Sequence, residues 1–505
     1  MQDLHTIGAC ARIKAYTNVE SAESHIDIVK AQPGKNGSYA YYRNGVVSVQ
    51  DIISAPAKMQ LSFTESGCSG YAQRPDVTAV YDAAGNVIHP NNYTIAYSNS
   101  NSAAPGTYSV TVNFVGAKYT GTLSQNYTLK IYPITTLKTV SSSTDTLEIS
   151  WNESSGAEGY YVYMATSKGG TYKKIATLTG SATTSCIIDE DLSAAKNYYF
   201  KIQPYSGSYK GEMSAILYSA TKPKKVSGLK KVSQSTSSVK LSWKKVSGAS
   251  GYDIQRYNSS KKKWETIKTV DNSTLSYTNK KLKAGTTYKY RVRAYRKNGS
   301  YYANGSASST LSVSTKPAQV KSLKNSSSTT TSIKIKWAKV TGASSYQIYQ
   351  YDSAKKKWKK IATVSGSKTS YTQKKLKEAT SYKYKVRAYR KSNGETLYGS
   401  YSSVLTTSTA PAKVKSLQAS SIGKTSLKLS WKKVTGASGY EIYQYNTAKK
   451  KYVKAATITK GKTVSKKLTK LKKKTTYKFK VRAYRKVSGV TYYGSFSSVK
   501  QVKTK

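Results

Sequence analysis

Apolar and polar residues alternate along most of this chain, in short runs separated by turn-forming residues. In the segment VKLSW, Val239, Leu241 and Trp243 fall on one face of an extended strand, and Lys240 and Ser242 fall on the other. Such runs predict half-buried β-strands, and the Gly, Ser, Asn and Asp clusters between them predict turns. We therefore expect an all-β protein.

The strand pattern repeats. Four tryptophans that end such a strand are spaced by 92, 94 and 94 residues, namely Trp151, Trp243, Trp337 and Trp431. Prolines recur at steps of 90, 94 and 94, namely Pro133, Pro223, Pro317 and Pro411. Proline lacks the N–H that a sheet ladder needs, so it suits the joint between two domains. We place the domain boundaries at these prolines.

Each repeat continues with the same two further elements. A small-residue turn leads into a second strand, as in GASGYEIYQY, and a leucine six residues before a tyrosine precedes a third. In this third strand, YKYRVRA of the second repeat, Tyr288, Tyr290, Val292 and Ala294 share one face. One face of this strand is expected in the core and the other in solvent.

The tryptophan strand, the GAxGY turn and the tyrosine strand together resemble the fibronectin type III family over residues 134–505. The resemblance implies tandem antiparallel β-sandwiches, arranged as beads on a string. It also implies a tyrosine corner, in which a hydroxyl ties down the loop before its strand, at Tyr198, Tyr288, Tyr382 and Tyr477. The first copy departs from the pattern at Gln203 and Pro204. Lysine- and tyrosine-rich copies of this kind resemble those of secreted and wall-associated proteins of Gram-positive gut bacteria.

We expect six segments. Residues 57–133 resemble a bacterial Ig-like β-sandwich repeat, and residues 1–56, with the hairpin signal SYAYYRNGVVSV, are read as a truncated β repeat. The four fibronectin-like domains are expected at 134–222, 223–316, 317–410 and 411–505. Their predicted core anchors are the four repeated tryptophans and the four corner tyrosines.

Charge is distributed very unevenly. Residues 1–222 contain 17 Lys and Arg against 16 Asp and Glu, whereas residues 223–505 contain 66 against 7. Two lysine-rich segments recur in the last three repeats, one ending in an aromatic residue (SSKKKW, SAKKKW, TAKKKY) and one before the corner tyrosine. The family topology implies that both lie at the same end of the sandwich.

The solvent face of the tyrosine strand adds a basic stripe, which is our candidate polyanion-binding site. Its members are Lys289, Arg291, Arg293, Tyr295, Lys383, Lys385, Arg387, Tyr389, Lys478, Lys480, Arg482 and Tyr484. Repeated weak sites gain avidity on a long polymer, so anionic polysaccharide, teichoic acid or glycosaminoglycan are candidate partners, with nonspecific nucleic-acid binding in vitro. Exposed lysines also protect sheet edges and maintain solubility, and this alternative stays open. Trp264 and Trp358 either pack over the sheet or offer a stacking face to sugars.

Nothing in the sequence predicts catalysis. Its three histidines, His5, His25 and His89, precede the fibronectin-like repeats, and the last three repeats hold no recurring carboxylate pair. We predict no catalytic, cofactor-binding or metal-binding residue. Cys10 and Cys68 either pair or remain free thiols, and Cys186 stands alone.

These observations predict a non-catalytic, secreted or cell-surface spacer or adhesion protein, monomeric and without membrane insertion. No signal peptide is recognisable at the start of the sequence, which we read as a fragment. The alternative is an accessory region of a larger secreted hydrolase whose catalytic domain lies outside this sequence.

Overall fold

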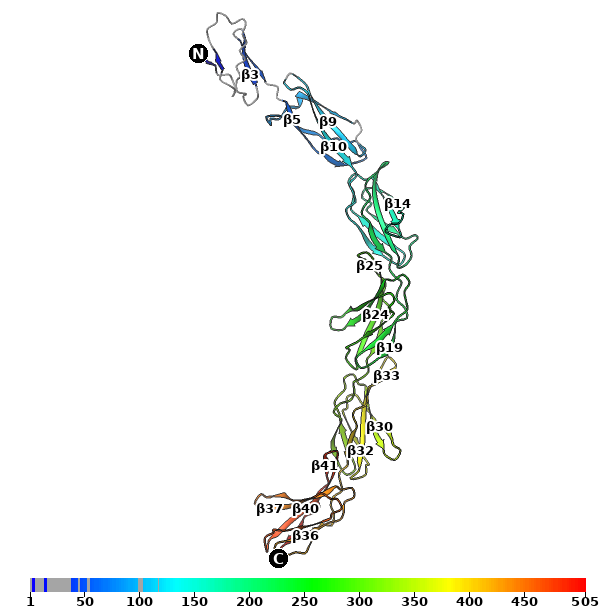
Figure 1. Cartoon of the computed structure of the whole chain (residues 1–505), viewed down its shortest axis with the longest axis vertical. Coiled ribbons are helices and arrows are strands. Elements are labelled where there is room, and N and C mark those ends of the chain that lie inside the picture. The colour runs from blue at the N-terminus through cyan, green and yellow to red at the C-terminus, as the bar shows by residue number, and fades with distance from the viewer. Residues whose placement is uncertain are drawn as a thin grey trace. The chain divides into compact units, whose positions relative to one another are not determined.

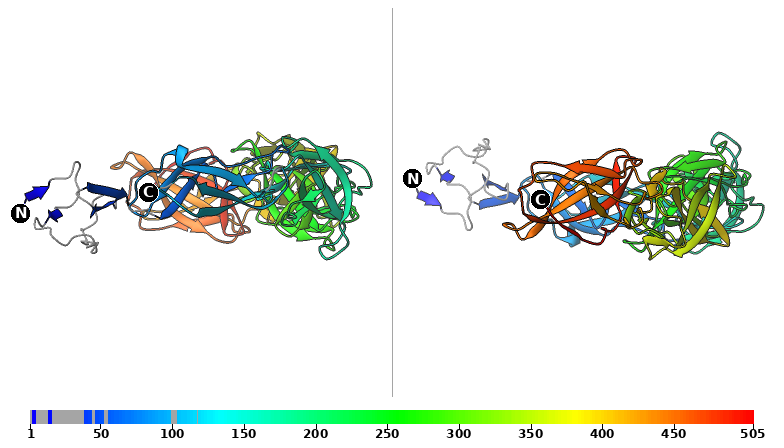
Figure 2. Two further views of the ribbon diagram at one scale, coloured as in Figure 1. Left: turned by 90° about the horizontal axis from the view of Figure 1, so that it is seen from above. Right: turned by 90° about the horizontal axis from the view of Figure 1, so that it is seen from below.

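The chain folds into strands and turns. The computed structural model describes residues 55–98, 103–116 and 118–505 with their side chains, and the backbone of four short strands before them. Within these residues the single helical element is a 3-10 turn, η1 (Pro90–Asn92). The predicted all-β class is confirmed, and modules of arrows joined by turns are visible in Figures 1 and 2. In this part of the chain, no helix has the length and apolar character needed to cross a membrane.

Two hairpins precede residue 55. The strands β1 (Gln2–Leu4) and β2 (Ile13–Ala15) pair antiparallel. The strands β3 (Ser38–Arg43) and β4 (Val46–Asp51) also pair antiparallel, with Arg43 opposite Val46. The second pairing is the hairpin that the RNG turn signal predicts.

Residues 56–130 form a separate β-domain of two sheets. One sheet pairs β5 with β7, and the other has the order β6-β10-β9-β8, with β6 parallel to β10. The strands are β5 (Pro56–Leu61), β6 (Glu65–Gly67), β7 (Val77–Asp82), β8 (Tyr93–Tyr97), β9 (Gly106–Phe114) and β10 (Thr122–Lys130). Met59 and Val80 of the first sheet pack with Val110 and Val112 of the second, so the core lies between the two sheets.

Four modules of one design follow, numbered 1 to 4 in chain order. Each has a three-stranded sheet in which the first two strands along the chain pair and the fifth joins the second. These strands are β11 (Leu137–Ser142), β12 (Leu147–Trp151) and β15 (Ser185–Ile188); β19 (Lys230–Gln234), β20 (Val239–Ser242) and β23 (Ser276–Asn279); β27 (Lys324–Ser328), β28 (Ile333–Lys336) and β31 (Ser370–Gln373); and β35 (Gln418–Ser420), β36 (Leu427–Ser430) and β39 (Ser465–Leu468).

The second sheet of each module has five strands, and the longest of them is the central strand. In module 3, for example, the order is β30-β29-β32-β33, and β34 also pairs with β32. These strands are β14 (Lys173–Thr179), β13 (Gly159–Ala165), β16 (Asn197–Ser206), β17 (Tyr209–Lys210) and β18 (Leu217–Ala220); β22 (Lys263–Asp271), β21 (Gly251–Asn258), β24 (Thr287–Asn298), β25 (Tyr301–Asn304) and β26 (Leu311–Ser314); β30 (Lys357–Ser365), β29 (Ser345–Asp352), β32 (Ser381–Ser392), β33 (Glu395–Tyr398) and β34 (Leu405–Ser408); and β38 (Lys451–Ile458), β37 (Gly439–Asn446), β40 (Thr476–Val487), β41 (Val490–Tyr493) and β42 (Lys500–Lys503). In module 1 the central strand β16 continues through Gln203 and Pro204 to Ser206.

The contacts of the chain group into two units. One comprises Met1–Lys225, Val246–Gly251 and Ala294–Ser306, and the other comprises Val226–Lys245, Tyr252–Arg293 and Ala307–Lys505. Modules 3 and 4 therefore lie wholly in the second unit.

Each module has a tryptophan buried between its two sheets. The four indoles are at most 6% exposed, and each meets the ring of a buried tyrosine from the larger sheet at 5.3 to 5.6 Å between centroids. The pairs are Trp151 with Tyr160, Trp243 with Tyr252, Trp337 with Tyr346 and Trp431 with Tyr440. Among the described residues, no hydrogen-bond acceptor reaches any of the four indole Nε1 atoms. These tryptophans therefore act as apolar anchors.

A second tyrosine in each module ties down the loop before the central strand. Its hydroxyl accepts a hydrogen bond from the backbone N–H five residues earlier, at 2.7 to 2.9 Å. The pairs are Tyr198 with Ser193, Tyr288 with Lys283, Tyr382 with Lys377 and Tyr477 with Lys472. This geometry fixes the backbone of a loop that carries lysines in modules 2 to 4.

Candidate polyanion-binding surface

The predicted basic stripe lies along the outer face of the central strands β24, β32 and β40. The core-facing residues of each strand are buried after the half-buried corner tyrosine, and the stripe residues between them are exposed or half-buried. In module 3 the inner stripe residues Lys385 and Arg387 lie opposite Tyr349 and Gln347 of the neighbouring strand β29. The stripe is therefore part of a side-chain layer that covers the sheet.

In module 3 the two inner cations lie against aromatic rings. The Lys385 Nζ is 4.0 Å from the ring centroid of Tyr401 and 4.5 Å from that of Trp358. The Arg387 Cζ is 4.1 Å from the Tyr398 centroid. Cation–π contacts of this kind contribute about 0.5–2 kcal/mol each, depending on how far they are removed from water. We refer to these cations and rings as the cation–aromatic ladder.

Module 4 repeats the ladder. The Lys480 Nζ is 4.1 Å from the centroids of both Tyr452 and Phe496, and the Arg482 Cζ is 3.7 Å from that of Tyr493. Arg482 also donates hydrogen bonds to the carboxylate of Glu441, at 2.9 Å from Nε and 2.7 Å from Nη2. Arg482 thus has partners on both neighbouring strands, β37 and β41, whereas Lys480 contacts rings from β38 and from the segment after β41.

In module 2 the cation–aromatic ladder has fewer contacts. The Arg291 Cζ lies 4.5 Å from the Trp264 centroid, and Arg293 forms an ion pair with Asp253 at 2.8 Å. Trp264 in module 2, like Trp358 in module 3, is half-buried and has a cation over its ring. Both tryptophans therefore pack on the sheet.

The environment of the sheet lowers the pKa of two inner cations, Lys385 and Arg291. Burial lowers the pKa of Lys385, an effect that Tyr349 opposes and the positive charge of Arg387 adds to. Burial likewise lowers the pKa of Arg291, and the charge of Arg293 adds to this effect. These inner residues stabilise the sheet, and each gives a polymer less accessible charge than a fully exposed lysine.

The first lysine of each stripe remains exposed. Lys289, Lys383 and Lys478 are exposed at the start of the central strand. The stripe tyrosines at the other end are half-buried and pair with tyrosines of the adjacent strand at 5.7 to 6.4 Å. They are Tyr295, Tyr389 and Tyr484. Polyanion binding by the stripe remains a prediction, and its accessible charge lies at one end.

Exposed lysines in two loops add to the charge at that end. Seven of them have a left-handed backbone with φ between 44° and 59°, a conformation that Gly, Asn or Asp adopts at lower cost. We name them the turn lysines: Lys262, Lys281, Lys356, Lys375, Lys450, Lys470 and Lys474. Module 1 has Asp191 at the position of Lys281. The loop geometry therefore accepts another side chain, and lysine is a choice specific to the basic modules.

Both lysine-bearing loops lie at the end of the sheet where the central strand begins. In module 3, Gln350 near the end of β29 pairs with Tyr384 near the start of β32. This register places the turn between β29 and β30 beside the exposed Lys383. The sequence predicted this shared end from family topology, and the register explains it.

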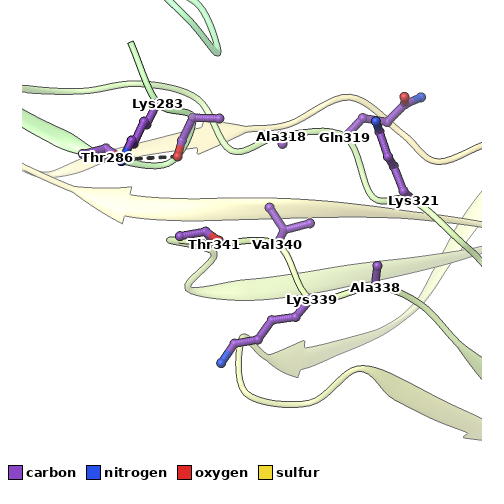
Figure 3. Close-up of a pocket in the computed structure, with 10 residues that line it drawn as sticks. Lys283, Thr286, Ala318, Gln319, Lys321, Ala338, Lys339, Val340 and Thr341 are labelled. Carbon is purple, nitrogen blue, oxygen red and sulfur yellow. Dashed lines mark hydrogen bonds between the residues drawn. The ribbon is translucent and has the colours of Figure 1, made fainter.

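Part of this charge borders a pocket between loops of modules 2 and 3. Figure 3 shows the lining residues, which come from the loop before β24, the segment before β27 and the turn after β28. The pocket has a volume of about 450 Å³ and is lined by Lys283, Ala284, Thr286, Ala318, Gln319, Lys321, Ala338, Lys339, Val340 and Thr341. We call it the Lys283 pocket. No sequence signal short of the fold could bring these three segments together.

Among the described residues, no group of three His, Cys, Asp or Glu side chains could hold a metal ion. Cys68 is buried and Cys186 half-buried, and burial raises the pKa of both thiols. Cys68 is a free thiol, and Cys10, for which the sequence leaves pairing with Cys68 and a free thiol both open, lies outside the described residues.

The residues of the four modules match one known family. A family model described as the fibronectin type III domain matches residues 132–220, 222–310, 317–403 and 411–493. The chain belongs to the fibronectin type III family. Fibronectin type III domains are non-catalytic modules, and the tandem arrangement is consistent with a modular spacer.

Two curated proteins share sequence with this fibronectin type III chain. Exoglucanase B of Cellulomonas fimi is 28% identical over 265 residues, which are 48% of this chain and 22% of that protein. The human receptor-type tyrosine-protein phosphatase H is 31% identical over 227 residues, 45% of this chain and 19% of that protein. The chain thus spans about a fifth of the length of each relative.

Solved fibronectin type III structures are also similar. The FN1-FN3 domains of chicken CNTN1 match with 20% identity and a TM-score of 0.25, covering 56% of this chain and 99% of that one. A two-domain segment of chicken tenascin matches with 21% identity and a TM-score of 0.26, covering 36% and 99%.

Proposed function

We propose that the chain is an extracellular, non-catalytic spacer whose modules 2 to 4 bind anionic polymers. The turn lysines, together with Lys289, Lys383 and Lys478, form the binding surface. Candidate ligands are teichoic acid, acidic polysaccharide or glycosaminoglycan. The inner stripe cations contribute by holding the sheet beneath this surface.

The proposal rests on one observation: lysines occupy exposed turn positions whose backbone is in the left-handed conformation. A requirement for solubility alone is met by lysine anywhere on the surface, and left-handed positions are among the least favourable places for it. All seven such lysines lie in modules 2 to 4, which carry nearly the whole net charge. Charge is thus gathered at one end of each basic module despite a local backbone cost.

The test compares two variants of the full chain with equal charge. In the first, the seven turn lysines become Gln. In the second, seven exposed lysines of the three-stranded sheets become Gln, namely Lys230, Lys240, Lys334, Lys336, Lys428, Lys466 and Lys467. Heparin and polyphosphate are the probes, and binding is measured by titration calorimetry.

We expect the unsubstituted chain to bind in a salt-dependent manner. A site with 6–10 charge contacts loses about 10³–10⁵ in affinity between 50 and 200 mM salt. The turn-lysine variant should lose at least tenfold more affinity than the sheet variant. Equal losses in the two variants, or salt-insensitive binding, would refute the proposal in favour of charge that serves solubility.

We further propose a surface-protein context. The β-domain at residues 56–130, with two sheets around one core, is read as an Ig-like repeat that precedes the fibronectin modules, as in bacterial surface proteins. Secretion is tested by locating the protein encoded by the complete gene, by fractionation of its native cells. Finding it in the cytoplasm would contradict this context.

A second candidate function is an accessory region of a secreted hydrolase. The similarity to part of Exoglucanase B favours it. The gene sequence flanking this chain provides the test, because a continuous reading frame with a hydrolase domain supports this function. Flanking sequence that encodes only further repeats would exclude it.

A further inference from the structure

The Lys283 pocket combines cations with a carbon-lined wall. Lys283, Lys321 and Lys339 are exposed, and none of the ten lining residues is acidic. The same lining includes Ala284 and Ala318, which are half-buried, Ala338, which is exposed, and the buried Val340. Figure 3 shows Lys283, Lys321 and Lys339 on three different segments. The pocket is thus basic at its edge and apolar along part of its wall.

Hydrogen bonds hold all three lysine-bearing segments in place. The backbone N–H of Lys283 donates to the Tyr288 hydroxyl at 2.8 Å, and its carbonyl accepts from the Thr315 hydroxyl at 2.7 Å. The Lys321 carbonyl accepts from the N–H of Ala338 at 3.0 Å, and the N–H of Val340 donates to the buried Tyr346 hydroxyl at 2.8 Å. A preorganised backbone lowers the entropy that a ligand must overcome on binding.

Arg390 links the loops on either side of the pocket. Its Nη1 donates to the carbonyl of Gly342, next to the lining residue Thr341, at 2.9 Å. Its Nη2 donates to the Thr287 hydroxyl, next to the lining residue Thr286, also at 2.9 Å. These bonds keep the turn after β28 beside the loop before β24, and so keep the pocket open between them.

The ammonium groups are available to a ligand. Among the described residues, none of the three lysines forms an ion pair with a carboxylate. Lysine is a compact cation on a flexible stem, so each can swing toward a bound anion.

We infer that the Lys283 pocket binds one acidic sugar residue of an anionic polysaccharide. The inference rests on the proposed function and specifies its ligand class. A volume of about 450 Å³ lies in the range of small-ligand sites, about 300–1,000 Å³. A sugar ring presents C–H groups that suit Ala284, Ala318 and Ala338, and its carboxylate or sulfate suits the lysines. A bare phosphate chain has no carbon face to use this wall.

The sequence repeats the basic set once more. The residues of modules 3 and 4 at the positions of Lys283, Lys321 and Lys339 are Lys377, Lys415 and Lys433. Modules 1 and 2 have Ser193, Ser227 and Lys245 there. The set therefore follows the basic modules, as the polymer-binding surface does.

The experiment uses the full chain and a sulfated heparin disaccharide, which is too short to bridge distant sites. The pocket variant carries Lys283→Gln, Lys321→Gln and Lys339→Gln, and the control carries Lys240→Gln, Lys334→Gln and Lys336→Gln. All six lysines are exposed, and circular dichroism verifies that both variants are folded. Tripolyphosphate serves as an anion without a carbon face, and intact heparin as the polymer.

We expect the unsubstituted chain to bind the disaccharide, with at least tenfold weaker binding by the pocket variant and less than twofold change in the control. Tripolyphosphate affinity should change equally in the two variants. Absent disaccharide binding, or equal loss in both variants, would overturn the inference. A tripolyphosphate loss as large as the disaccharide loss would overturn the sugar assignment.

The binding of intact heparin tests the proposed function separately. If the pocket variant retains salt-sensitive heparin binding, the proposed function stands. If the unsubstituted chain does not bind heparin at 50 mM salt, the proposed function itself is refuted.

Discussion

The repeated tryptophan is the largest side chain buried in each module core. In module 3, Trp337 is 5% exposed and packs edge-on against Tyr346 at 5.4 Å. Its indole N–H has no acceptor, so replacing it leaves no unsatisfied partner and the cost is one of lost packing. The alternation of VKLSW-type strands made this residue predictable from sequence.

Trp337→Ala should destabilise module 3 by about 3–5 kcal/mol, because it leaves a large cavity between the sheets. A domain of this size has roughly 5–15 kcal/mol of stability. Hydrogen exchange resolved by mass spectrometry should show the loss within residues 317–410. Equal loss of protection in modules 1 and 4 would contradict an independent core in each module.

Modules 2 to 4 have three different residues at the position of Glu441, and each accepts a hydrogen bond from an arginine of the central strand. The equivalent residues are Asp253 in module 2 and Gln347 in module 3. The Glu441 side chain is 5% exposed. Burial raises the pKa of Glu441, but hydrogen bonds from Arg482, Lys454 and Tyr443 outweigh this and hold the pKa below its ordinary value of 4.5.

This lowered pKa predicts an acid-sensitive module 4. The carboxylate contributes its full stabilisation above the unfolded pKa of about 4.5, and the contribution is lost as the pH falls through the lower folded pKa. Glu441→Gln should reduce module 4 stability by about 1–2 kcal/mol at pH 7, since a neutral hydrogen bond replaces a charged one. It should also flatten the acid dependence.

Urea unfolding from pH 7 to pH 3, followed at module 4, provides the measurement. Gln347→Glu in module 3 is the converse control and should introduce the same acid dependence there. An unchanged pH profile in Glu441→Gln would exclude the carboxylate as its source.

At the scale of elements, the central strand has two functional faces. Its inner face fills the core, and its outer face carries the cation–aromatic ladder. The alternation of YKYRVRA predicts this division, and the tyrosine corner follows from the family resemblance. The partners of the outer face were not predictable, because they come from other strands.

Strand register places one ring of the ladder, Trp358, in a way that the alternation of residues does not predict. A β-bulge between Ile348 and Tyr349 shifts the pairing of β29 with β30, and the shifted register sets Tyr351 opposite Trp358. A one-residue shift moves side chains to the other face, and the turn sequence does not announce it. The alternation alone predicts a solvent-facing basic stripe, whereas Lys385 and Arg387 lie against rings supplied by neighbouring strands and segments.

Substitutions along β32 test the ladder. Lys385→Met keeps the aliphatic stem and removes the cation from between Tyr401 and Trp358, and we expect module 3 to lose about 1–2 kcal/mol. Lys383→Met on the same face replaces an exposed lysine and should change stability by less than about 0.5 kcal/mol. Chemical denaturation measures both, and equal effects would argue against the ladder.

At the scale of the whole molecule, charge separates module 1 from modules 2 to 4. Residues 134–222 contain eight basic and eight acidic residues, whereas residues 223–505 contain 66 and 7. The sequence predicted both this division and the fibronectin type III modules. It could not predict the Lys283 pocket, because the pocket requires three loops that are far apart along the chain.

The charge division predicts different responses to salt. Self-repulsion destabilises a highly charged fold, and salt screens it within about 10 Å at 0.1 M. Raising NaCl from 20 to 200 mM should therefore increase the protection of modules 2 to 4 in hydrogen exchange and leave module 1 nearly unchanged. A uniform response across all four modules would show that the charges are too well solvated to interact.

The partnerless indole N–H of each core tryptophan also gives the chain built-in optical probes. An excited indole shifts its emission to longer wavelength when surrounding dipoles can reorient, and these four rings lie among apolar side chains. Modules 1 and 4 each hold one tryptophan, whereas modules 2 and 3 each have a second ring beside a cation. Replacing Trp264 and Trp358 with Phe would leave one short-wavelength emitter per module, each reporting on the opening of its own sandwich without any added dye.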